Sequence, residues 1–436
     1  MCSRDIVRGY QLVSNAPFFP DKADEKGLSQ AQIGWVTAAI EITGLASSLL
    51  VAMVISPRNL RSFFLCGILW SSVSVALFGW SENSKNGSPF FLLCMATRCA
   101  NGVGSALVHN SGLPLATGLF PGKSAMITAL IHCSNGLGVL LGPLLGSLIY
   151  SVGGYQWIFI STGLFGASTL IFSFLIIPEH VDFSFTKSKI QPGKIFKFIF
   201  TPRVLMFLIP NTILVSTSGF KNSAFSVYYK DYLNISDELS GYMFLPFAIG
   251  FFIAAPAYGL LTKLGYGCLI EICAQFLTCF ILFCFYIPQI VPYFENIYYI
   301  LTILFVYGTL QSSVYNPQYL IMEKLALSLG YKNIAEIRTM STSSFGLFTA
   351  FSRSFGATLF GGYVNEWVGY YNTCLCYACL LLLTSIWMLL FLVSQGLANS
   401  GVFYSSGDGL ISMNCSANLD KDSSKSNEDK METNFN

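Results

Sequence analysis

The sequence predicts an all-α membrane protein of about eleven spanning helices in two related halves. Of its 436 residues, 53% are hydrophobic and only 11% are Asp, Glu, Lys or Arg, whereas a soluble domain carries about 25% charged residues. Long apolar runs alternate with short polar turns, and several motifs recur at a nearly constant offset. Helices are expected because they satisfy their own backbone hydrogen bonds in lipid.

The composition also excludes several classes of function. A mean hydropathy of +0.58 and a net charge of +2 do not fit a soluble enzyme, a nucleic-acid binder or a disordered chain. Gly102-x-Gly104 lies within an apolar run and not after a strand, so it is no nucleotide-binding motif. Cys376-x-x-Cys379 lacks His partners and is interpreted as helix packing. We therefore expect a lipid bilayer as partner and no enzymatic activity, cofactor, metal, ATP or nucleic acid.

Eleven runs are long enough to span a bilayer, which takes about 20 apolar residues. Two longer polar segments divide the chain into an N-terminal transmembrane half (1–177), a cytoplasmic central loop (178–203), a C-terminal transmembrane half (204–396) and a disordered cytoplasmic tail (397–436). The predicted spans are 31–56, 62–81, 89–118, 124–150, 155–177, 204–229, 238–262, 267–288, 296–322, 338–364 and 370–395.

The distribution of Lys and Arg predicts the orientation, because cytoplasmic loops are richer in these residues. Placing segment 178–203 and the tail in the cytoplasm assigns twelve basic loop residues to that side and four to the other. The sequons at Asn86 and Asn234 then lie on the non-cytoplasmic side, where both are glycosylation candidates.

An internal repeat supports two halves. Leu28-Ser29-x4-Gly34-Trp35 recurs 207 residues later as Ile235-Ser236-x4-Gly241-Tyr242, and Gly146, Gly154 and Tyr155 recur 215 residues later as Gly361, Gly369 and Tyr370.

The repeat also predicts that a helix is missing. The C-terminal half has a span at 204–229 before its copy of the motif, but residues 1–14 carry Arg4, Asp5 and Arg8 and cannot span a bilayer. We expect the first helix of a twelve-helix design to be absent or replaced, through an incomplete gene model or a splice form.

Two motifs carry a resemblance to a known family. Arg98-x3-Gly102-x-Gly104 in one span and Gly138-x3-Gly142-Pro143-x2-Gly146 in the next resemble the major facilitator superfamily. The second motif is similar to the signature of its proton-coupled antiporters, although Ser147 stands where the family has a further glycine. Its glycines allow close helix approach, and Pro143 removes a backbone donor.

Three segments are most similar to the vesicular amine transporter family, in particular its polyamine-type branch. They are 16–34, 135–159 and 341–362. The resemblance implies proton-coupled antiport of organic cations, polyamines or monoamines, into acidic vesicles by alternating access. It also implies an intracellular vesicle membrane, with the plasma membrane as the alternative.

Charged residues at membrane depth are functional candidates because they are costly there. The candidates for proton or substrate coupling are Glu41, Arg98, Lys221 and Arg353. Glu41 is either a carboxylate that exchanges a proton for a cation, or one half of a fixed ion pair with Arg98 or another basic residue. Glu271, near a helix end, is expected to reach the interface.

The balance of these charges leaves the substrate open. Three basic groups face one clear midspan carboxylate, so an organic-anion or other small-solute transporter and a truncated, non-transporting isoform are alternatives. From the resemblance, further polar residues are expected to line the central cavity: Asn211, Thr212, Ser216, Tyr307, Gln311, Tyr315 and Asn316.

Overall fold

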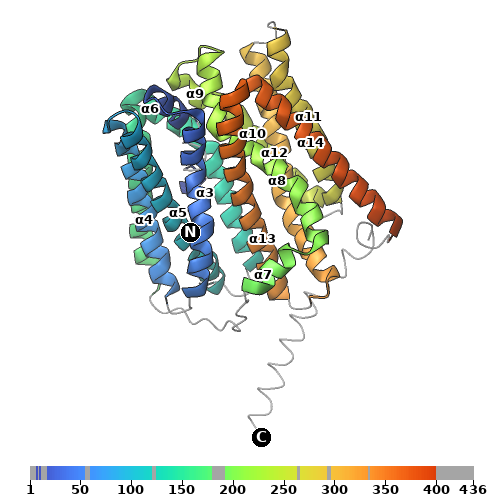
Figure 1. Cartoon of the computed structure of the whole chain (residues 1–436). Helices are drawn as coiled ribbons and strands as arrows, with labels where there is room; N and C mark the ends of the chain where they lie inside the picture. The colour runs from blue at the N-terminus through green and yellow to red at the C-terminus, as the bar shows by residue number, and fades with distance from the viewer. Residues whose placement is uncertain are drawn as a thin grey trace.

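The protein is a bundle of long helices in the computed structural model (Figure 1). The structure describes residues 6–7, 9–10, 17–54, 59–119, 124–178, 192–262, 266–291, 296–331 and 334–398, and within these ranges it contains no strand. The elements are α2 (Phe19–Glu25), α3 (Gln30–Val54), α4 (Leu60–Trp80), η1 (Ser81–Asn83), α5 (Ser88–Leu119), α6 (Ser124–Ile176), α7 (Pro192–Ile199), α8 (Pro202–Asp231), α9 (Asp237–Met243), α10 (Leu245–Leu261), α11 (Gly267–Ile290), α12 (Ile297–Ser328), α13 (Ile334–Phe355), η4 (Gly356–Val364) and α14 (Asn365–Ala398).

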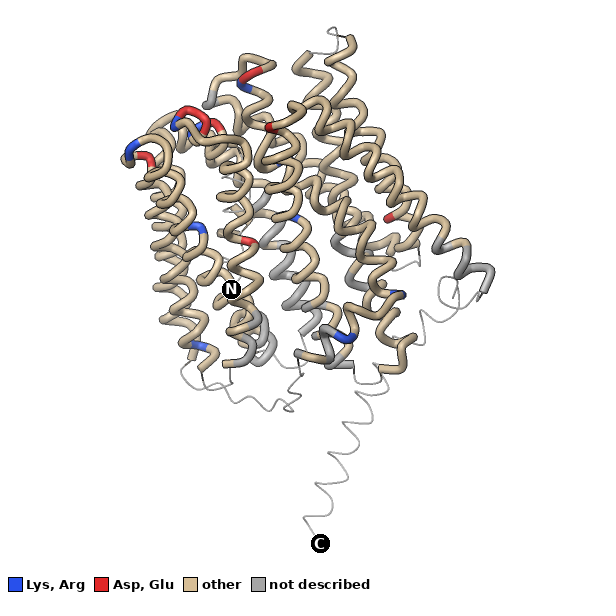
Figure 2. The backbone as a smooth tube through the Cα atoms, in the orientation of Figure 1, with Lys and Arg blue, Asp and Glu red and all other residues tan. Residues whose placement is uncertain are grey.

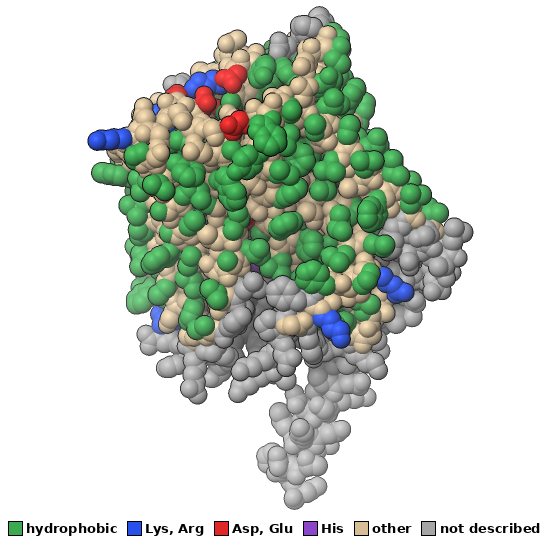
Figure 3. All heavy atoms as spheres, viewed as in Figure 1, with side chains coloured by type: hydrophobic (Ala, Val, Ile, Leu, Met, Phe, Trp, Pro, Cys, Tyr) green, Lys and Arg blue, Asp and Glu red, His purple; other side chains and the backbone are tan. Residues whose placement is uncertain are grey.

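The outer surface of the bundle is apolar along its length, as lipid requires. Within the described chain, eight helical stretches are long and apolar enough to cross a membrane. Large apolar side chains such as Ile176, Leu175 and Trp367 are more than 70% exposed, and hydrophobic side chains are spread over the middle of the face in Figure 3. This confirms the predicted all-α membrane fold, while the count of eleven spans stays a prediction.

The helices pack in two groups. The first helix group comprises α2 to α6, and the second comprises α8 to α14 with η4. Aromatic residues fill the second group, where the rings of Tyr228 and Tyr370 stack with centroids 4.0 Å apart and Phe225, Phe285 and Tyr307 pack nearby. Such rings contribute large buried areas to a core.

Two glycines reverse the chain at equivalent places in the two groups. Gly154 breaks α6 with φ 74° and ψ −169°, and Gly369 breaks α14 with φ 80° and ψ 168°. The following residues, Tyr155 and Tyr370, are both buried. Only glycine adopts this backbone region without strain, which explains why the sequence repeat retains these two pairs.

Part of the amino-terminal segment packs on α6. Residues 6, 7, 9 and 10 are helical, and the side chains of Val7 and Tyr10 are buried. A Cβ at Gly138 would collide with the backbone of Ile6 and Gly9. Gly138 of the predicted antiporter motif is therefore a contact point for this segment.

Most charged residues gather near the ends of the bundle, and few lie along the helices (Figure 2). One end carries α2, η1 and α9. The other carries α7 (Figure 1). In the predicted orientation, the α9 end is the non-cytoplasmic end.

We predict that Gly154→Ala and Gly369→Ala each lower the free energy of unfolding by about 1–3 kcal/mol, because alanine is strained at these backbone angles. No atom would contact a Cβ added at either position, so backbone strain is the whole effect. Thermal unfolding in detergent checks this. Gly346→Ala, in the middle of α13 with open space around it, is the control and should not lower stability. Equal melting temperatures for all three variants would contradict the prediction.

Candidate functional site

An ion pair between the two helix groups joins two of the predicted residues. Arg353 of α13 donates from Nε to Oε1 of Glu41 at 2.8 Å and from Nη2 to Oε2 at 3.0 Å. Glu41 lies on α3, in the first group. Both side chains are mostly buried, with 16% and 19% of Glu41 and Arg353 exposed. A two-pronged pair of this kind is strong and geometrically specific. Glu41 thus forms an ion pair whose partner is Arg353, and its exchange of a proton for a cation stays a prediction.

Small residues bring the backbones around this pair close together. A Cβ at Gly34 of α3 would collide with the carbonyl of Ala357 in η4, and one at Gly362 would press on Ala31. On the other side, a Cβ at Gly219 of α8 would collide with the backbone of Arg353. Arg353 is thus held between α3 and α8, which fixes the direction of its guanidinium.

Polar contacts continue this interface toward the non-cytoplasmic end. The Ala31 N–H at the start of α3 donates to Oε2 of Glu366 at 3.0 Å, and Trp35 Nε1–H donates to the Tyr363 hydroxyl at 3.0 Å. A carboxylate at a helix N-terminus accepts from otherwise unsatisfied N–H groups. The first turns of α3 are therefore capped by the second helix group.

A charge network at the same end adds an exposed link between the groups. Nζ of Lys230, at the end of α8, lies 3.1 Å from Oε1 of Glu25. Nζ of Lys22 lies 3.4 Å from Oε2 of Glu25 and 3.0 Å from Oε1 of Glu82. Burial acts to raise the pKa of Glu25, but the hydrogen bonds and charges of Lys230 and Lys22 outweigh it and lower the pKa below its ordinary 4.5. Lys22 and Lys230 are two of the four basic loop residues predicted on the non-cytoplasmic side, but the sequence did not indicate their partners.

Arg98 occupies the interior of the first helix group. It is 5% exposed, and its guanidinium carbon lies 3.8 Å from the ring centroid of Phe78. Phe78 in turn packs against Tyr155 and Phe159. The guanidinium is attracted to the ring face, so Arg98 links α5 to α4 at the level where α6 reverses.

Lys221 is buried on α8 between two aromatic rings. Its Nζ lies 4.2 Å from the ring centroid of Phe247 and 4.9 Å from that of Phe244, and 2% of the residue is exposed. Within the described residues, no carboxylate pairs with it. It lies two residues beyond Gly219, so the α8 segment that touches Arg353 also carries this ammonium.

The glycine and proline motif lies at a contact between the groups. Gly142, Pro143 and Gly146 are buried on α6. A Cβ at Gly241 of α9 would meet Oγ of Ser147 and the carbonyl of Pro143. The motif thus packs α6 against α9, and Ser147, where the antiporter pattern has glycine, faces a glycine of the other group.

Most predicted cavity residues make contacts within the second helix group. Asn211 bonds Glu271, Ser216 Oγ lies 2.9 Å from the Tyr377 hydroxyl, and Gln311 Nε2 donates to the Leu214 carbonyl at 3.2 Å. Tyr307 is fully buried among aromatic rings, and Thr212 bonds the Leu208 carbonyl. The side chains of Tyr315 and Asn316 lie outside the described residues. Lining of a cavity by these residues stays a prediction.

One expectation was wrong. Glu271 lies near the start of α11, but its side chain does not reach the interface: it is 0% exposed. Position along a helix predicted an interfacial carboxylate, whereas the face of α11 that carries Glu271 turns toward α8.

The structure also describes the two predicted glycosylation sites and the side chains that could bind a metal. Asn86 and Asn234 are both exposed, as an acceptor of glycans must be. In the described part of the chain, no three His, Cys, Asp or Glu side chains are grouped to hold a metal.

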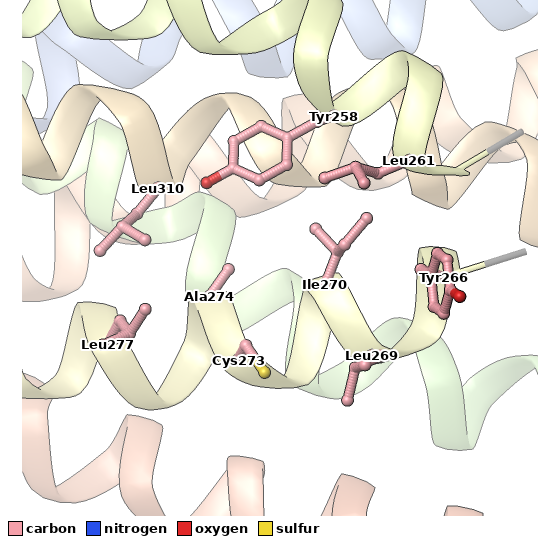
Figure 4. A pocket seen from close by; sticks show the side chains of 9 residues that line it. All are labelled: Tyr258, Leu261, Tyr266, Leu269, Ile270, Cys273, Ala274, Leu277 and Leu310. Atoms are coloured by element: carbon pink, nitrogen blue, oxygen red, sulfur yellow. The ribbon is translucent and has the colours of Figure 1, made fainter. Parts of the chain in front are cut away.

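An apolar cavity of about 260 Å³ lies between α10 and α11 (Figure 4). It contains no predicted site residue. Its lining is Tyr258, Leu261, Tyr266, Leu269, Ile270, Cys273, Ala274, Leu277 and Leu310.

Comparison with known proteins identifies relatives. Residues 6–360 match the family model described as Major Facilitator Superfamily. The MFS-type transporter SLC18B1 of Mus musculus is 25% identical over 248 residues, which are 56% of this chain and 53% of that protein. The Homo sapiens protein of the same name is 26% identical over 248 residues, with the same shares. The matched part of the chain thus spans about half the length of these relatives.

Solved structures show the same fold. A bacterial homolog of the human lysosomal transporter Spinster, inward-facing and unoccupied, matches with a TM-score of 0.66 and 12% identity, covering 89% of this chain and 96% of that one. A D-xylose-proton symporter matches with a TM-score of 0.65 and 14% identity, covering 89% and 95%.

We predict that Glu25→Gln lowers the melting temperature by a small, constant amount from about pH 7 to about pH 5. A lowered pKa means that the bridge to Lys230 contributes fully above the ordinary pKa of 4.5. The contribution disappears only as the pH falls through the lowered value. Thermal unfolding at a series of pH values checks this.

Asp24→Asn is the control, since it makes the same charge change in the same helix, α2, without removing a salt bridge found in the described chain. It should not lower the melting temperature, since the charge of Asp24 repels that of Asp231. A difference between wild type and Glu25→Gln that vanishes already above pH 5 would contradict the prediction.

Proposed function

The chain belongs to the major facilitator superfamily, a family of membrane transporters and not of enzymes, and we propose that it exchanges protons for organic cations by alternating access. The substrate class is polyamines or monoamines, moved into acidic vesicles across the vesicle membrane. The similarity to SLC18B1 over 56% of the chain supports this choice, together with the motif Gly138-x3-Gly142-Pro143-x2-Gly146, which resembles that of proton-coupled antiporters.

The observation that carries the proposal is the Glu41–Arg353 pair. It joins a helix of the first group to a helix of the second, so it must break whenever the groups separate at this level. Two positively charged species can compete with Arg353 for the carboxylate: a proton and a substrate ammonium. Either one weakens the pair, since protonation removes the negative charge and an ammonium takes its place.

This competition couples binding to opening. With Arg353 bound, α3 lies against α13 and η4, and the non-cytoplasmic end is closed by the contacts of Ala31, Trp35 and Glu25. With a proton or a cation on Glu41, the strongest link across the interface is lost and the groups can rock apart. One site then serves both ions in turn, which is the requirement for antiport.

The test is uptake of labelled spermidine and serotonin into proteoliposomes with an imposed pH gradient, acidic inside. We expect accumulation of at least one amine that collapses when a protonophore dissipates the gradient. Accumulation that is unchanged by the protonophore would exclude proton coupling, and the absence of uptake of any amine would exclude the substrate class.

We predict that Glu41→Gln lowers gradient-driven uptake by roughly tenfold or more, equivalent to about 1.4 kcal/mol, because a neutral amide binds neither ion. Arg353 is left without its partner in this variant, so the double variant Glu41→Gln with Arg353→Met keeps the test valid if the single one folds poorly. Glu366→Gln is the matched control, since it removes another carboxylate that links the groups but stays exposed. Gradient-driven uptake that survives in the double variant would remove Glu41 from the mechanism.

Lys221 favours a second candidate, transport of organic anions. A buried ammonium held by rings is available to a substrate carboxylate. The same proteoliposomes, given labelled mono- and dicarboxylates, distinguish the two. On the proposed function we expect no anion uptake in wild type, and we expect Lys221→Met to retain at least half of the amine uptake, roughly within the twofold scatter of such contributions. Anion uptake that Lys221→Met abolishes would establish the second candidate instead.

A further inference from the structure

A buried polar cluster lies inside the second helix group, on residues that the proposed exchange does not use. It consists of Asn211 on α8 and Glu271 and Gln275 on α11, and each of the three is 0% exposed. Gln275 also contacts the sulfur of Met388 on α14, at 3.4 Å. The cluster is thus enclosed by three helices of one group.

Two hydrogen bonds connect the three side chains, from Gln275 to Asn211 and from Asn211 to Glu271. Nε2 of Gln275 donates to Oδ1 of Asn211 at 3.2 Å, and Nδ2 of Asn211 donates to Oε2 of Glu271 at 3.0 Å. The two ends of this chain are Oε1 of Glu271 and Oε1 of Gln275. Both oxygens are buried and neither has a hydrogen-bond partner.

The two ends belong to residues on one face of α11, and they cannot bond to each other as they stand. Glu271 and Gln275 are four residues apart on one helix, so their side chains share a face on adjacent turns. A carboxylate oxygen and an amide carbonyl oxygen are both acceptors only. One added proton changes this, because a carboxylic acid has an O–H that can donate.

No positive group compensates Glu271 in the described chain. It forms no salt bridge, and α11 and α10 carry no other charged residue. The charged residue of α14 is Glu366, at the far end of that helix, and the side chains of Glu323 and Lys324 on α12 lie outside the described residues. The charged residues of α8 are Arg203, Lys221, Lys230 and Asp231, none of which pairs with Glu271.

We propose that Glu271 binds a proton on Oε1 and donates it to Oε1 of Gln275. The carboxylate and the proton combine to a neutral carboxylic acid, and no other bond changes. The added hydrogen bond closes a ring through Asn211, Glu271 and Gln275. This satisfies both unpartnered oxygens and removes an uncompensated charge from the helix interior.

The proton site ties α8 to α11. α8 also packs against α2 and α3 of the first group and against η4, and it carries Gly219 next to Arg353. A proton at Glu271 therefore fixes the helix against which the Glu41–Arg353 pair is held. The site is independent of the proposed amine exchange, since it depends only on the cluster itself.

Infrared spectroscopy of the full chain in lipid nanodiscs tests the proposal, because a protonated carboxyl has a C=O stretching band that a carboxylate lacks. We expect this band in wild type at neutral pH, its loss in Glu271→Gln and its retention in Glu41→Gln. Gln275→Leu should keep the band and shift it to higher frequency, because the acceptor is gone. A purely structural role for Gln275 would not produce this shift.

The variant Glu271→Gln is expected to fold normally, so loss of the band in it cannot be attributed to misfolding. An amide can occupy the same ring, accepting from Asn211 and donating to Gln275, so we expect its melting temperature to match that of wild type at neutral pH. At alkaline pH the variant should become the more stable protein, since it has no proton to lose.

Two results would overturn the proposal. The first is a wild-type spectrum with no carboxylic-acid band that depends on Glu271, which would mean an ionised carboxylate. The second is loss of that band when sodium chloride replaces choline chloride, which would assign the site to a metal cation. Neither result depends on transport, so the proton site and the proposed antiport can fail separately.

Discussion

A charge in the interior of a lipid-embedded bundle has to be neutralised, and this constraint decides where the ionisable side chains of the protein lie. Glu41, Arg98, Lys221 and Glu271 meet it in three different ways. Glu41 is neutralised by the guanidinium of Arg353, with two hydrogen bonds. Arg98 and Lys221 lie over aromatic rings, whose negative faces attract cations. Glu271 has amide neighbours alone within the described chain. The mode of neutralisation, and not the mere presence of a charge, distinguishes the sites.

Small residues make the ion pair between the groups possible. The guanidinium reaches the carboxylate because Gly34 lets α3 approach η4 and Gly219 lets α8 approach α13. In lipid, association of helices depends on such close packing, since the solvent is as apolar as the side chains. The interface therefore combines close backbone packing, which does not depend on charge, with one ion pair, which does. Neutralising Glu41 removes the ion pair but leaves the packing, so the interface can weaken without losing its shape.

The sequence predicted the parts of the structure that depend on local chemistry. Apolar runs marked the helices to within a few residues, and the pairs Gly154–Tyr155 and Gly369–Tyr370 marked equivalent reversals because glycine alone adopts those backbone angles without strain. The partners of the charges could not be predicted, since Glu41 and Arg353 are 312 residues apart and their meeting depends on how two helix groups pack. Glu271 was assigned wrongly for a related reason. Its distance from the helix end is readable in the sequence, but the face that meets α8 is a property of the packed bundle.

The three modes of neutralisation respond differently to separation of the helix groups. Arg98 and its ring both belong to the first group, whereas Lys221 contacts rings of α10 and of the residue before it, in or beside the second group. Glu271 has both of its amide neighbours in the second group. These interactions lie within one helix group and stay intact when that group rotates as a rigid body. Of the charges at Glu41, Arg98, Lys221 and Glu271, only the one at Glu41 is neutralised by a residue of the other group, Arg353. Rocking of the groups therefore removes the neutralisation of the Glu41–Arg353 pair, and a cation that replaces Arg353 at Glu41 lowers the free energy that this costs. The charge of a proton or of an ammonium is thereby linked to the motion by the position of a single ion pair.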